Sequence, residues 1–341
     1  MATDGTLGPR LRLAGPEVTI PARLGQTRGK NLFHSFARFG VEEGQRVTFT
    51  GPSGLRNIIG RVTGGAPSTI DGTLRSKVPG ADLWLLNPAG ILFGPDARLA
   101  VQGSFHASTA DELRFADGAV FSARAPGGSV LSVAAPQAFG FLGARPAPVT
   151  VDRSVLAVPE GKALSLTGGN VTVTARNQGA ASGNLAGILQ AEAGRVTLAA
   201  LGGPGAVAVA TGRATGAVSG AVHLSGEAVV TASGDGGGTI RIRAGRLVVE
   251  DRSSILADNV GGTNARGGIT VTADTLDLNN DSAVTSDVLG IGNAGRVELR
   301  ARTVRIRNGS YISSSSFGLG NAADITLMAD HLIIDGNGNP D

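Results

Sequence analysis

The sequence predicts an all-β protein, a right-handed parallel β-helix (solenoid) with an N-terminal cap. Three observations predict it: 53 glycines among 341 residues, short runs in which apolar and polar residues alternate, and a pattern that returns at a nearly constant interval. A glycine inside a helix costs about 1 kcal/mol relative to alanine, so this composition favours strands and corners. Alternation with a period of two indicates short strands that turn one face inward.

Residues 1–40 are the predicted cap. An open solenoid end exposes strand edges and core side chains, so it needs a cover. His34 in this segment is expected to be a packed or surface histidine, because no second histidine or carboxylate stands at a metal-binding spacing beside it. Within NLFHSFARF, the apolar residues lie close to helical spacing: Leu32, Phe33, Phe36 and Phe39.

Residues 41–236 are predicted to continue as a β-helix with loop insertions. The run AGRVTLAA at 193–200 nearly repeats AGRVELRA at 294–301, and KALSLTGGNVTVTA contains two alternating runs. The glycine-rich tract 201–220 has coil-like patterns on both sides. We therefore expect a loop or a distorted coil there and not a linker between domains.

Residues 237–341 carry the clearest repeat, because one pattern occurs there four times. With Ala244, Ala273, Ala301 and Ala329 as equivalent points, the intervals are 29, 28 and 28 residues. Units this small cannot bury their own inward face, so they must stack, with equivalent strands about 4.8 Å apart. Parallel crossovers are right-handed in the great majority of cases. The inward positions are Ile240, Ile242, Leu247, Val249, Ile255, Ile269, Val271, Leu276, Leu278, Val284, Val297, Leu299, Val304, Ile306 and Ile312.

Two motifs within the repeats are predicted to be corners. Asp251, Asn280 and Asn308 each fall seven residues past the reference alanine, where a short amide or carboxylate can bond to nearby backbone. GIGNAG, at 290–295, matches a dinucleotide fingerprint, but the strand-like RVELRA follows it where that fingerprint requires a helix. We therefore expect turn glycines and no nucleotide site.

Composition argues against several classes of function. The net charge is only +3, from 30 basic and 27 acidic residues, and basic patches interleaved with aromatics are missing, so we expect no nucleic-acid partner. The lack of cysteine removes disulfides, thiolate metal sites and cysteine nucleophiles, and we predict neither a metal nor a cofactor. No apolar run reaches the roughly 18 residues that span a bilayer, so we expect no stable membrane insertion.

Both ends of the sequence suggest a piece of a longer protein. MATDGTLGPRLRL has no apolar signal-peptide core, so an exported form would have lost its signal. HLIIDGNGNPD stops directly after a strand-like run. We therefore expect the regular coils to be truncated at the C-terminus.

The stretch LWLLNPAGILFGP, residues 83–95, joins two apolar runs through Asn87, Pro88, Ala89 and Gly90. Proline fixes one φ angle and glycine can take a positive one. The four residues therefore have the chemistry of a tight turn.

Five motifs, taken in order, resemble the secretion domains of filamentous haemagglutinin-like exoproteins of two-partner secretion in Gram-negative bacteria. They are DGTLG, GKNLFHSFARFGV, NIIGRVTGGAPSTIDGTL, LWLLNPAGILFG and APQAFGFLG, and the resemblance covers roughly residues 4–200. In the family's turn signature Asn-Pro-Asn-Gly-Ile, the residues Asn87, Pro88, Gly90 and Ile91 match, while Ala89 replaces the second asparagine. For a second signature, Asn-Pro-Asn-Leu, the sequence offers only GPSGLRN.

The resemblance implies an exported passenger and not an enzyme. In the family, the unfolded domain is bound in the periplasm by the POTRA domains of an outer-membrane transporter, crosses it, and folds outside, where it templates the rest of the solenoid. An extended segment can add to a sheet edge of such a receptor. The resemblance thus implies a secreted or cell-surface adhesin that travels through the periplasm, and we expect a monomer whose surface receptor the sequence does not identify. Asn87, Pro88, Gly90 and Ile91 are the candidate site, either as transporter contacts or as a structural corner.

Two other functions stay open at this stage. A carbohydrate-active β-helix enzyme needs clustered carboxylates, whereas the outward repeat positions hold mainly arginine and threonine. Ser53, in GPSGL, lacks the glycine that a nucleophile elbow requires. A glycan-binding or protein-binding module would use the outer face, where arginines recur, although such a stripe is usually a solvated face: Arg241, Arg243, Arg305 and Arg307.

Overall fold

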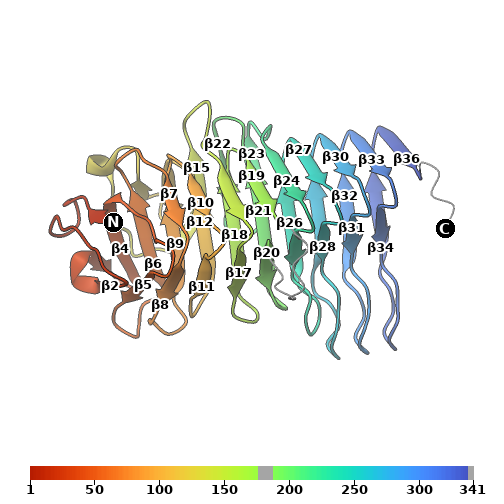
Figure 1. Cartoon of the computed structure of the whole chain (residues 1–341), viewed down its shortest axis with the longest axis horizontal. Coiled ribbons are helices and arrows are strands. Elements are labelled where there is room, and N and C mark those ends of the chain that lie inside the picture. Colours follow the sequence, from red (N-terminus) through yellow and green to blue (C-terminus); the bar gives the residue numbers. More distant parts are fainter. Residues whose placement is uncertain (176–186, 337–341) are drawn as a thin grey trace.

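The computed structural model describes residues 1–175 and 187–336 and has the predicted fold class, a parallel β-helix (Figure 1). From β7 onward, each complete turn of the coil contributes one strand to each of three long sheets, so neighbours within a sheet come from successive turns. Equivalent strands pair in parallel along the whole stack, as Ile240 with Ile269 and Ile269 with Val297 show.

Sheet A contains β1 (Ala2–Thr3), β4 (Asn31–Arg38), β6 (Asn57–Val62), β9 (Asp82–Leu86), β12 (Phe105–Ser108), β18 (Ala163–Gly168), β21 (Arg195–Ala200), β26 (Thr239–Arg243), β29 (Gly268–Thr272), β32 (Arg296–Arg300) and β35 (Ile325–Met328), with β3 (Gln26–Arg28) beside β4. Sheet B contains β2 (Glu17–Pro21), β5 (Arg46–Thr50), β8 (Thr73–Ser76), β11 (Arg98–Ala100), β17 (Val155–Val158), β20 (Ile188–Ala191), β25 (Val229–Thr231), β28 (Ser254–Leu256), β31 (Ala283–Thr285) and β34 (Tyr311–Ser313). Sheet C contains β7 (Ser68–Ile70), β10 (Ile91–Phe93), β16 (Val149–Asp152), β19 (Val171–Thr174), β24 (Ala221–Ser225), β27 (Arg246–Val249), β30 (Thr275–Leu278), β33 (Thr303–Arg307) and β36 (His331–Asp335).

The core fills the space enclosed by sheets A, B and C. The inward residues predicted from the repeats are buried, apart from Ile312, which is half-buried and packs against the same core. Each stacked position repeats a similar side chain, such as Ile255 above Val284. The alternation therefore produces one continuous column of aliphatic side chains along the axis.

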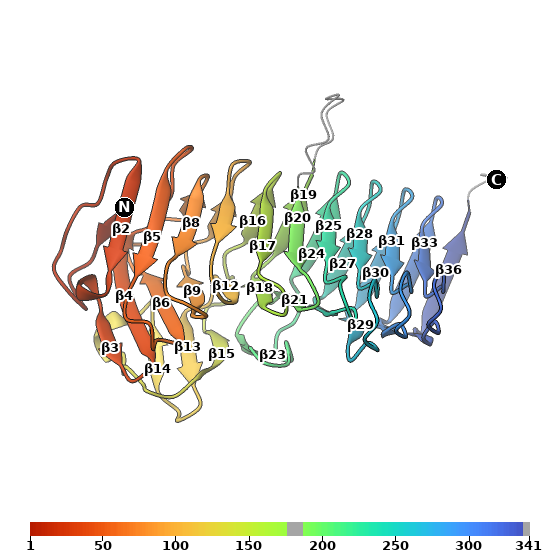
Figure 2. The same cartoon turned by 90° about the horizontal axis from the view of Figure 1, so that it is seen from below.

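Sheet D is antiparallel and lies over the outer face of sheet A near the N-terminal end (Figure 2). It is formed by two insertions into the coil: β13 (Glu112–Phe115), β14 (Val120–Ser122) and β15 (Pro136–Phe141) from the first, and β22 (Gly205–Ala208) and β23 (Ala214–Gly216) from the second. A second apolar cluster fills the layer between the sheets, with Phe33 and Trp84 from sheet A against Phe139 from sheet D. The glycine-rich tract 201–220 is thus not an irregular loop, because its middle forms the β22–β23 hairpin.

The segment NLFHSFARF forms the strand β4, although its apolar residues lie close to helical spacing. Leu32, His34 and Phe36 face the main core, while Phe33 faces the layer under sheet D. A strand buried on both faces is apolar at consecutive positions, and that is why its pattern imitates a helix. Strands β1 and β3 pair with β4 in the antiparallel sense and cover this end of sheet A.

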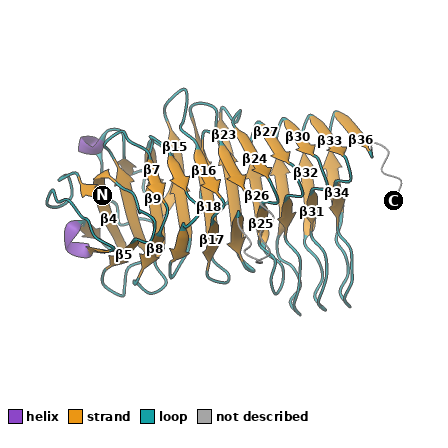
Figure 3. Ribbon diagram, in the orientation of Figure 1, coloured by secondary structure: helices purple, strands orange, loops and turns teal. Residues whose placement is uncertain are grey.

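Helices are minor in the described part of the chain. Two single turns of 3-10 helix occur, η1 (Ala22–Leu24) and η2 (Pro126–Gly128), both near the N-terminal end (Figure 3). Among the described residues, no helix has the length and apolar character needed to cross a membrane.

The predicted corner residues do form corners, and their backbones take left-handed conformations. Asp251, Asn280 and Asn308 have φ angles of 56°, 54° and 51°, a region that Asn and Asp tolerate better than most residues. The Asn280 amide donates to Asp251 Oδ1 at 2.9 Å, and the Asn308 amide donates to Asn280 Oδ1 at 3.3 Å. The 290–295 motif also lies in a loop, and strand β32 follows it.

Candidate functional site: the Asn-Pro-Ala-Gly turn

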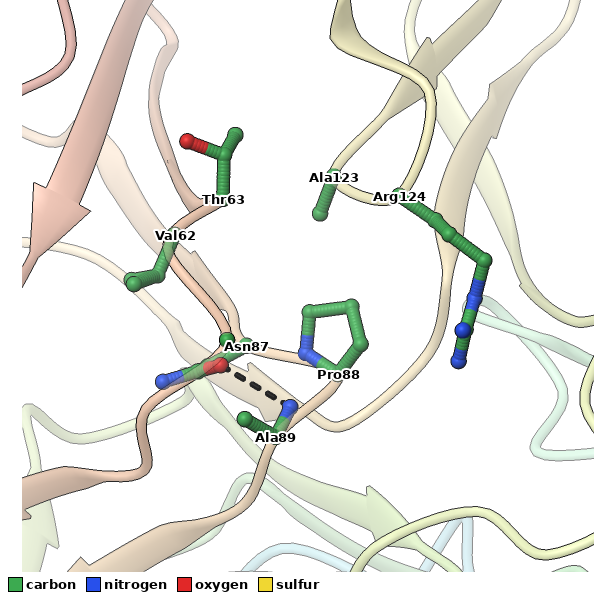
Figure 4. Close-up of a pocket in the computed structure, with 8 residues that line it drawn as sticks. Val62, Thr63, Asn87, Pro88, Ala89, Ala123 and Arg124 are labelled. Carbon is green, nitrogen blue, oxygen red and sulfur yellow. Dashed lines mark hydrogen bonds between the residues drawn. The ribbon is translucent and has the colours of Figure 1, made fainter.

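The turn between β9 and β10 is closed by two hydrogen bonds of its own. The Gly90 N–H donates to the Asn87 carbonyl at 3.1 Å, and the Ala89 N–H donates to Asn87 Oδ1 at 3.0 Å (Figure 4). The second bond is the Asx-type contact that asparagine makes with backbone two residues ahead. Gly90 has a φ of +123°, which a residue with a side chain rarely adopts.

The Asn87 side chain also joins this turn to the preceding coil. It is completely buried, and its amide nitrogen donates to the Ala66 carbonyl at 3.0 Å and to Ser68 Oγ at 2.9 Å. The Asn87 side chain thus uses both its donor and its acceptor capacity inside the protein. Because asparagine supplies both kinds of group, few other side chains could take its place.

Backbone bonds hold the turn from both sides. The Ser68 N–H donates to the Gly90 carbonyl at 3.0 Å, and the Ile91 N–H donates to the Pro148 carbonyl at 3.2 Å. Ile91 itself is buried in the main core and lies between Ser68 and Val149 in sheet C. The turn is therefore part of the joint between three successive coils.

The four predicted site residues divide into two groups. Asn87, Gly90 and Ile91 are buried, whereas Pro88 is half-exposed. Ala89, which replaces the second asparagine of the family signature, is also half-exposed. In the folded protein, the surface of the turn therefore consists of Pro88 and Ala89.

A pocket of about 290 Å³ opens beside the turn (Figure 4). Its walls come from the end of β6, from the turn itself and from the segment after β14, and Pro88 faces Ala123 across it. The Arg124 guanidinium at the rim is paired with Asp111 at 2.5 Å. The lining residues are Val62, Thr63, Gly65, Asn87, Pro88, Ala89, Ala123 and Arg124.

Behind the pocket, the buried Arg61 joins three parts of the chain. Its guanidinium donates to Ser35 Oγ on β4 at 2.8 Å, to the Ser122 carbonyl on β14 at 2.7 Å and to Thr6 Oγ1 at 3.1 Å. It also stacks on the Phe121 ring, 4.3 Å from the centroid. Burial lowers the pKa of Arg61 to about 10, opposed by the charge of Asp4, so the guanidinium stays charged at neutral pH.

Asp4 completes this network from the N-terminal segment. It accepts hydrogen bonds from the hydroxyls of Ser35 at 2.6 Å, Thr63 at 2.8 Å and Thr6 at 2.8 Å. Burial raises the pKa of Asp4, but these hydrogen bonds outweigh it and hold the pKa below the usual value. Residues from DGTLG, GKNLFHSFARFGV and NIIGRVTGG thus meet in one network behind the turn.

Sequence reasoning found the turn but missed the residues around it. Thr63, Ala123 and Arg124 come from distant segments, and Asp4 and Arg61 become neighbours only when the N-terminal segment folds against β6. Asp4, Arg61 and Thr63 all lie within the five motifs that carry the family resemblance. Their presence in those motifs was the one sign in the sequence that they could belong to a common site. Among the described residues, no group of three or more His, Asp or Glu side chains is placed to hold a metal ion.

Comparisons with known proteins address the family and the fold of the chain. The family model of the TPS secretion domain matches residues 2–262. Among solved structures, the HMW1 secretion domain from Haemophilus influenzae is similar, with a TM-score of 0.59 at 16% identity over 95% of this chain and 96% of that one. The filamentous hemagglutinin secretion domain gives a TM-score of 0.47 at 18% identity over 96% of this chain and 94% of that one. A search of curated proteins gave no match.

Proposed function

The chain belongs to the TPS secretion domain family, and from that premise we propose that it marks a larger exoprotein for export and starts β-helix folding outside the cell. The family match carries this proposal, because it spans all five ordered motifs and the Asn-Pro-Ala-Gly turn. Domains of this family are recognised by outer-membrane transporters and belong to secreted exoproteins. The family consists of secretion domains and not of enzymes.

The finer steps are also part of the proposal. The periplasmic POTRA domains of the transporter bind the chain while it is unfolded, after a signal peptide has brought it to the periplasm. The folded product is a monomer. We also retain the division into a cap at 1–40, a secretion-domain β-helix at 41–236 and regular coils at 237–341.

The burial of Asn87 supports a recognition step that precedes folding. Its amide is occupied by Ala66 and Ser68 and is inaccessible in the folded protein. In an extended chain, the same side chain and the backbone of the turn are free to bind a sheet edge of the transporter. Folding outside would then withdraw Asn87 from the transporter and make binding and folding mutually exclusive.

The N-terminal end of the β-helix supports a folding direction. Strands β1 and β3 block the edge of β4 with antiparallel pairing, so no further parallel strand can add there. Coils can add only on the other side of β4, where β6 and the following strands stack in order. Because each repeat contacts mainly its neighbours, folding can spread from a formed end.

An export assay tests the proposal. The chain, with a signal peptide, is expressed together with the transporter encoded beside its gene, and the medium and periplasm are compared for the parent, Asn87→Ala, Gly90→Ala and the control Ala89→Ser. We expect the parent and the control to reach the medium. A parent that stays in the periplasm would overturn the proposed function.

Refolding of the purified variants separates the two roles of the turn. Variants that stall in the periplasm but refold in vitro would assign transporter recognition to Asn87 and Gly90. Variants that stall and cannot refold would assign them a structural role alone, and recognition would then lie in other residues.

A further inference from the structure

The outer face of sheet A changes character where sheet D ends. From β4 to β21, this face is covered by sheet D, whereas β26, β29 and β32 lie beyond its last strand, β23 (Figure 2). The tip of the β22–β23 hairpin rests on the boundary, because Arg195 and Arg241 both donate to the Ala210 carbonyl, at 3.0 and 3.4 Å. The β22–β23 hairpin stands above the uncovered outer face of β26, β29 and β32, and we call this edge the step.

Five arginines gather at this step, and we call them the arginine shelf: Arg195, Arg213, Arg241, Arg243 and Arg300. Arg241 and Arg243 are alternate residues of β26 and therefore point to the same face. Arg243 pairs with Thr272 on β29, which in turn pairs with Arg300 on β32. At the usual strand spacing, Arg243 and Arg300 are thus about 10 Å apart along the axis.

Four of the five shelf arginines have no carboxylate partner within the described structure. Glu298 is paired with Arg300, but the part of the chain that the structure describes places no carboxylate within ion-pair distance of Arg195, Arg213, Arg241 or Arg243. Burial and then the charges of Arg195 and Arg243 lower the pKa of Arg241. Burial and then Arg213 and Arg300 lower that of Arg243, against the opposing effect of Glu298. The guanidinium groups therefore repel one another where they stand.

Two arginines of sheet C show the opposite arrangement. Arg246 and Arg305 both pair with the buried carboxylate of Asp277, each at 3.2 Å. The Asp277 carboxylate thus offsets part of the positive charge of Arg246 and Arg305 within the protein, and an external anion would gain less there. Apart from Glu298 beside Arg300, the described part of the shelf has no such carboxylate, so an anionic ligand would relieve the repulsion among Arg195, Arg213, Arg241 and Arg243.

We propose that the arginine shelf binds an acidic polysaccharide, a linear glycan with carboxylate or sulfate groups at regular intervals. Guanidinium groups bind such planar or multi-oxygen anions with paired, charge-assisted hydrogen bonds. Arg243 and Arg300 lie in one row along the β-helix axis, and this arrangement suits a chain with repeated charges. Single-stranded nucleic acids favour aromatic platforms for stacking, whereas the large exposed aromatics, Tyr311 and Phe317, belong to β34 and the loop after it. This proposal does not depend on export.

Binding of the purified full chain to defined polymers tests the proposal. The probes are a short heparin for sulfate, polygalacturonate for carboxylate, uncharged dextran, and a single-stranded DNA of matched charge. We expect binding to both anionic glycans at physiological ionic strength, with no binding to dextran. The double variant Arg241→Gln/Arg243→Gln should lose about tenfold in affinity, and the slope of log affinity against log salt should fall by about two.

The control variant removes two exposed arginines from the N-terminal region, Arg23→Gln/Arg28→Gln, and has the same net charge as the shelf variant. It should bind the glycans like the parent. An equal loss in the control would reduce the effect to net charge and overturn the proposal. Absence of glycan binding by the parent, or DNA binding that is tighter and equally sensitive to the shelf variant, would overturn it as well. Because transport plays no part in this assay, its failure is distinct from failure of export.

Discussion

Asn87 donates a hydrogen bond to Ser68 Oγ over 2.9 Å, across the boundary between two coils. Ser68 is completely buried and is the first residue of β7, so this contact fixes where sheet C begins. A motif identified as a turn thus stabilises the stacking of coils. Its effect on folding should be measurable without any transporter.

Asn87→Ala should lower the free energy of unfolding by about 2 to 3 kcal/mol, because it removes several hydrogen bonds and leaves the buried Ser68 hydroxyl without this donor. Denaturant unfolding of the purified chain measures the change. Ala89→Ser is the matched control, since the Ala89 side chain is half-exposed and should be nearly neutral. A stability of Asn87→Ala within 0.5 kcal/mol of the parent, roughly the scatter of surface substitutions, would refute the structural role.

Gly90→Ala should cost about 1 to 2 kcal/mol through backbone strain at a φ of +123°. Space is not the cause, because a Cβ at Gly90 would meet its nearest neighbours at 3.7 Å or more. Gly54→Ala is a suitable control, since a Cβ there meets nothing within 4 Å and its φ is not in the positive range. Equal effects of the two substitutions would show that the conformation of Gly90 is not what matters.

The free energy of unfolding should fall as the pH is lowered from 7 to 5, because two buried histidines resist protonation. Burial lowers the pKa of His34 to about 4, against the opposing effect of the Leu24 backbone. Burial and then the charge of Arg195 lower the pKa of His106 to about 3. In the unfolded chain, both protonate near pH 6.5. The unfolded state therefore binds more protons in this range, and each histidine contributes a loss of about 2 kcal/mol.

His34→Leu isolates one half of this effect. The ring packs between Phe36 and Phe49, so leucine can fill much of the space while removing the titration. The loss of stability between pH 7 and 5 should then shrink by about 2 kcal/mol. Asp4, whose pKa is lowered, would contribute only below about pH 4, outside this window. An unchanged pH dependence in His34→Leu would exclude His34 as its source.

Arg61→Met should destabilise the chain by about 3 to 5 kcal/mol, since it removes the buried charge that acts on the Asp4 carboxylate and the shorter of the two hydrogen bonds to the Ser122 carbonyl. Arg28→Met, at an exposed position, is the control. Limited proteolysis should also show earlier cleavage within 1–30 and 120–135, because Arg61 links both segments to β6. Uniform loosening of the whole chain would contradict this local role.

The regular part of the fold could be predicted because its coils contact only their immediate neighbours and therefore share one short sequence pattern. A strand with one face inward must alternate apolar and polar residues, and stacked coils must repeat that pattern. Ile240 and Ile269, one coil apart, could therefore be recognised as equivalent positions from the sequence. The same reasoning failed at β4, since a strand buried on both faces loses its alternation. It also failed at residues 205–216, because small residues such as Ala206 and Val207 pair with β15, and nothing in their own sequence points to that partner.

In the candidate site, too, the features set by neighbouring residues could be predicted and those set by distant segments could not. The tight turn at Asn87 to Gly90 follows from the local chemistry of asparagine, proline and glycine. The contact of Asn87 with Ser68 and the approach of Arg124 depend on which coils become neighbours. Arg124 comes from the insertion that forms sheet D, and Thr63 is bonded to the segment that carries Asp4. Neither segment has a periodic signature.

The ladder of corner residues from Asp251 to Asn308 makes one complete coil the smallest unit by which the β-helix can change its length. Each corner depends on its counterpart one full turn away, so the shaft can be shortened or extended without damage only by whole turns. Removal of residues 268–295 would bring Arg296 into the place of Gly268, its present partner in sheet A, and keep every later residue in phase. Removal of half that number would put outward arginines into the core.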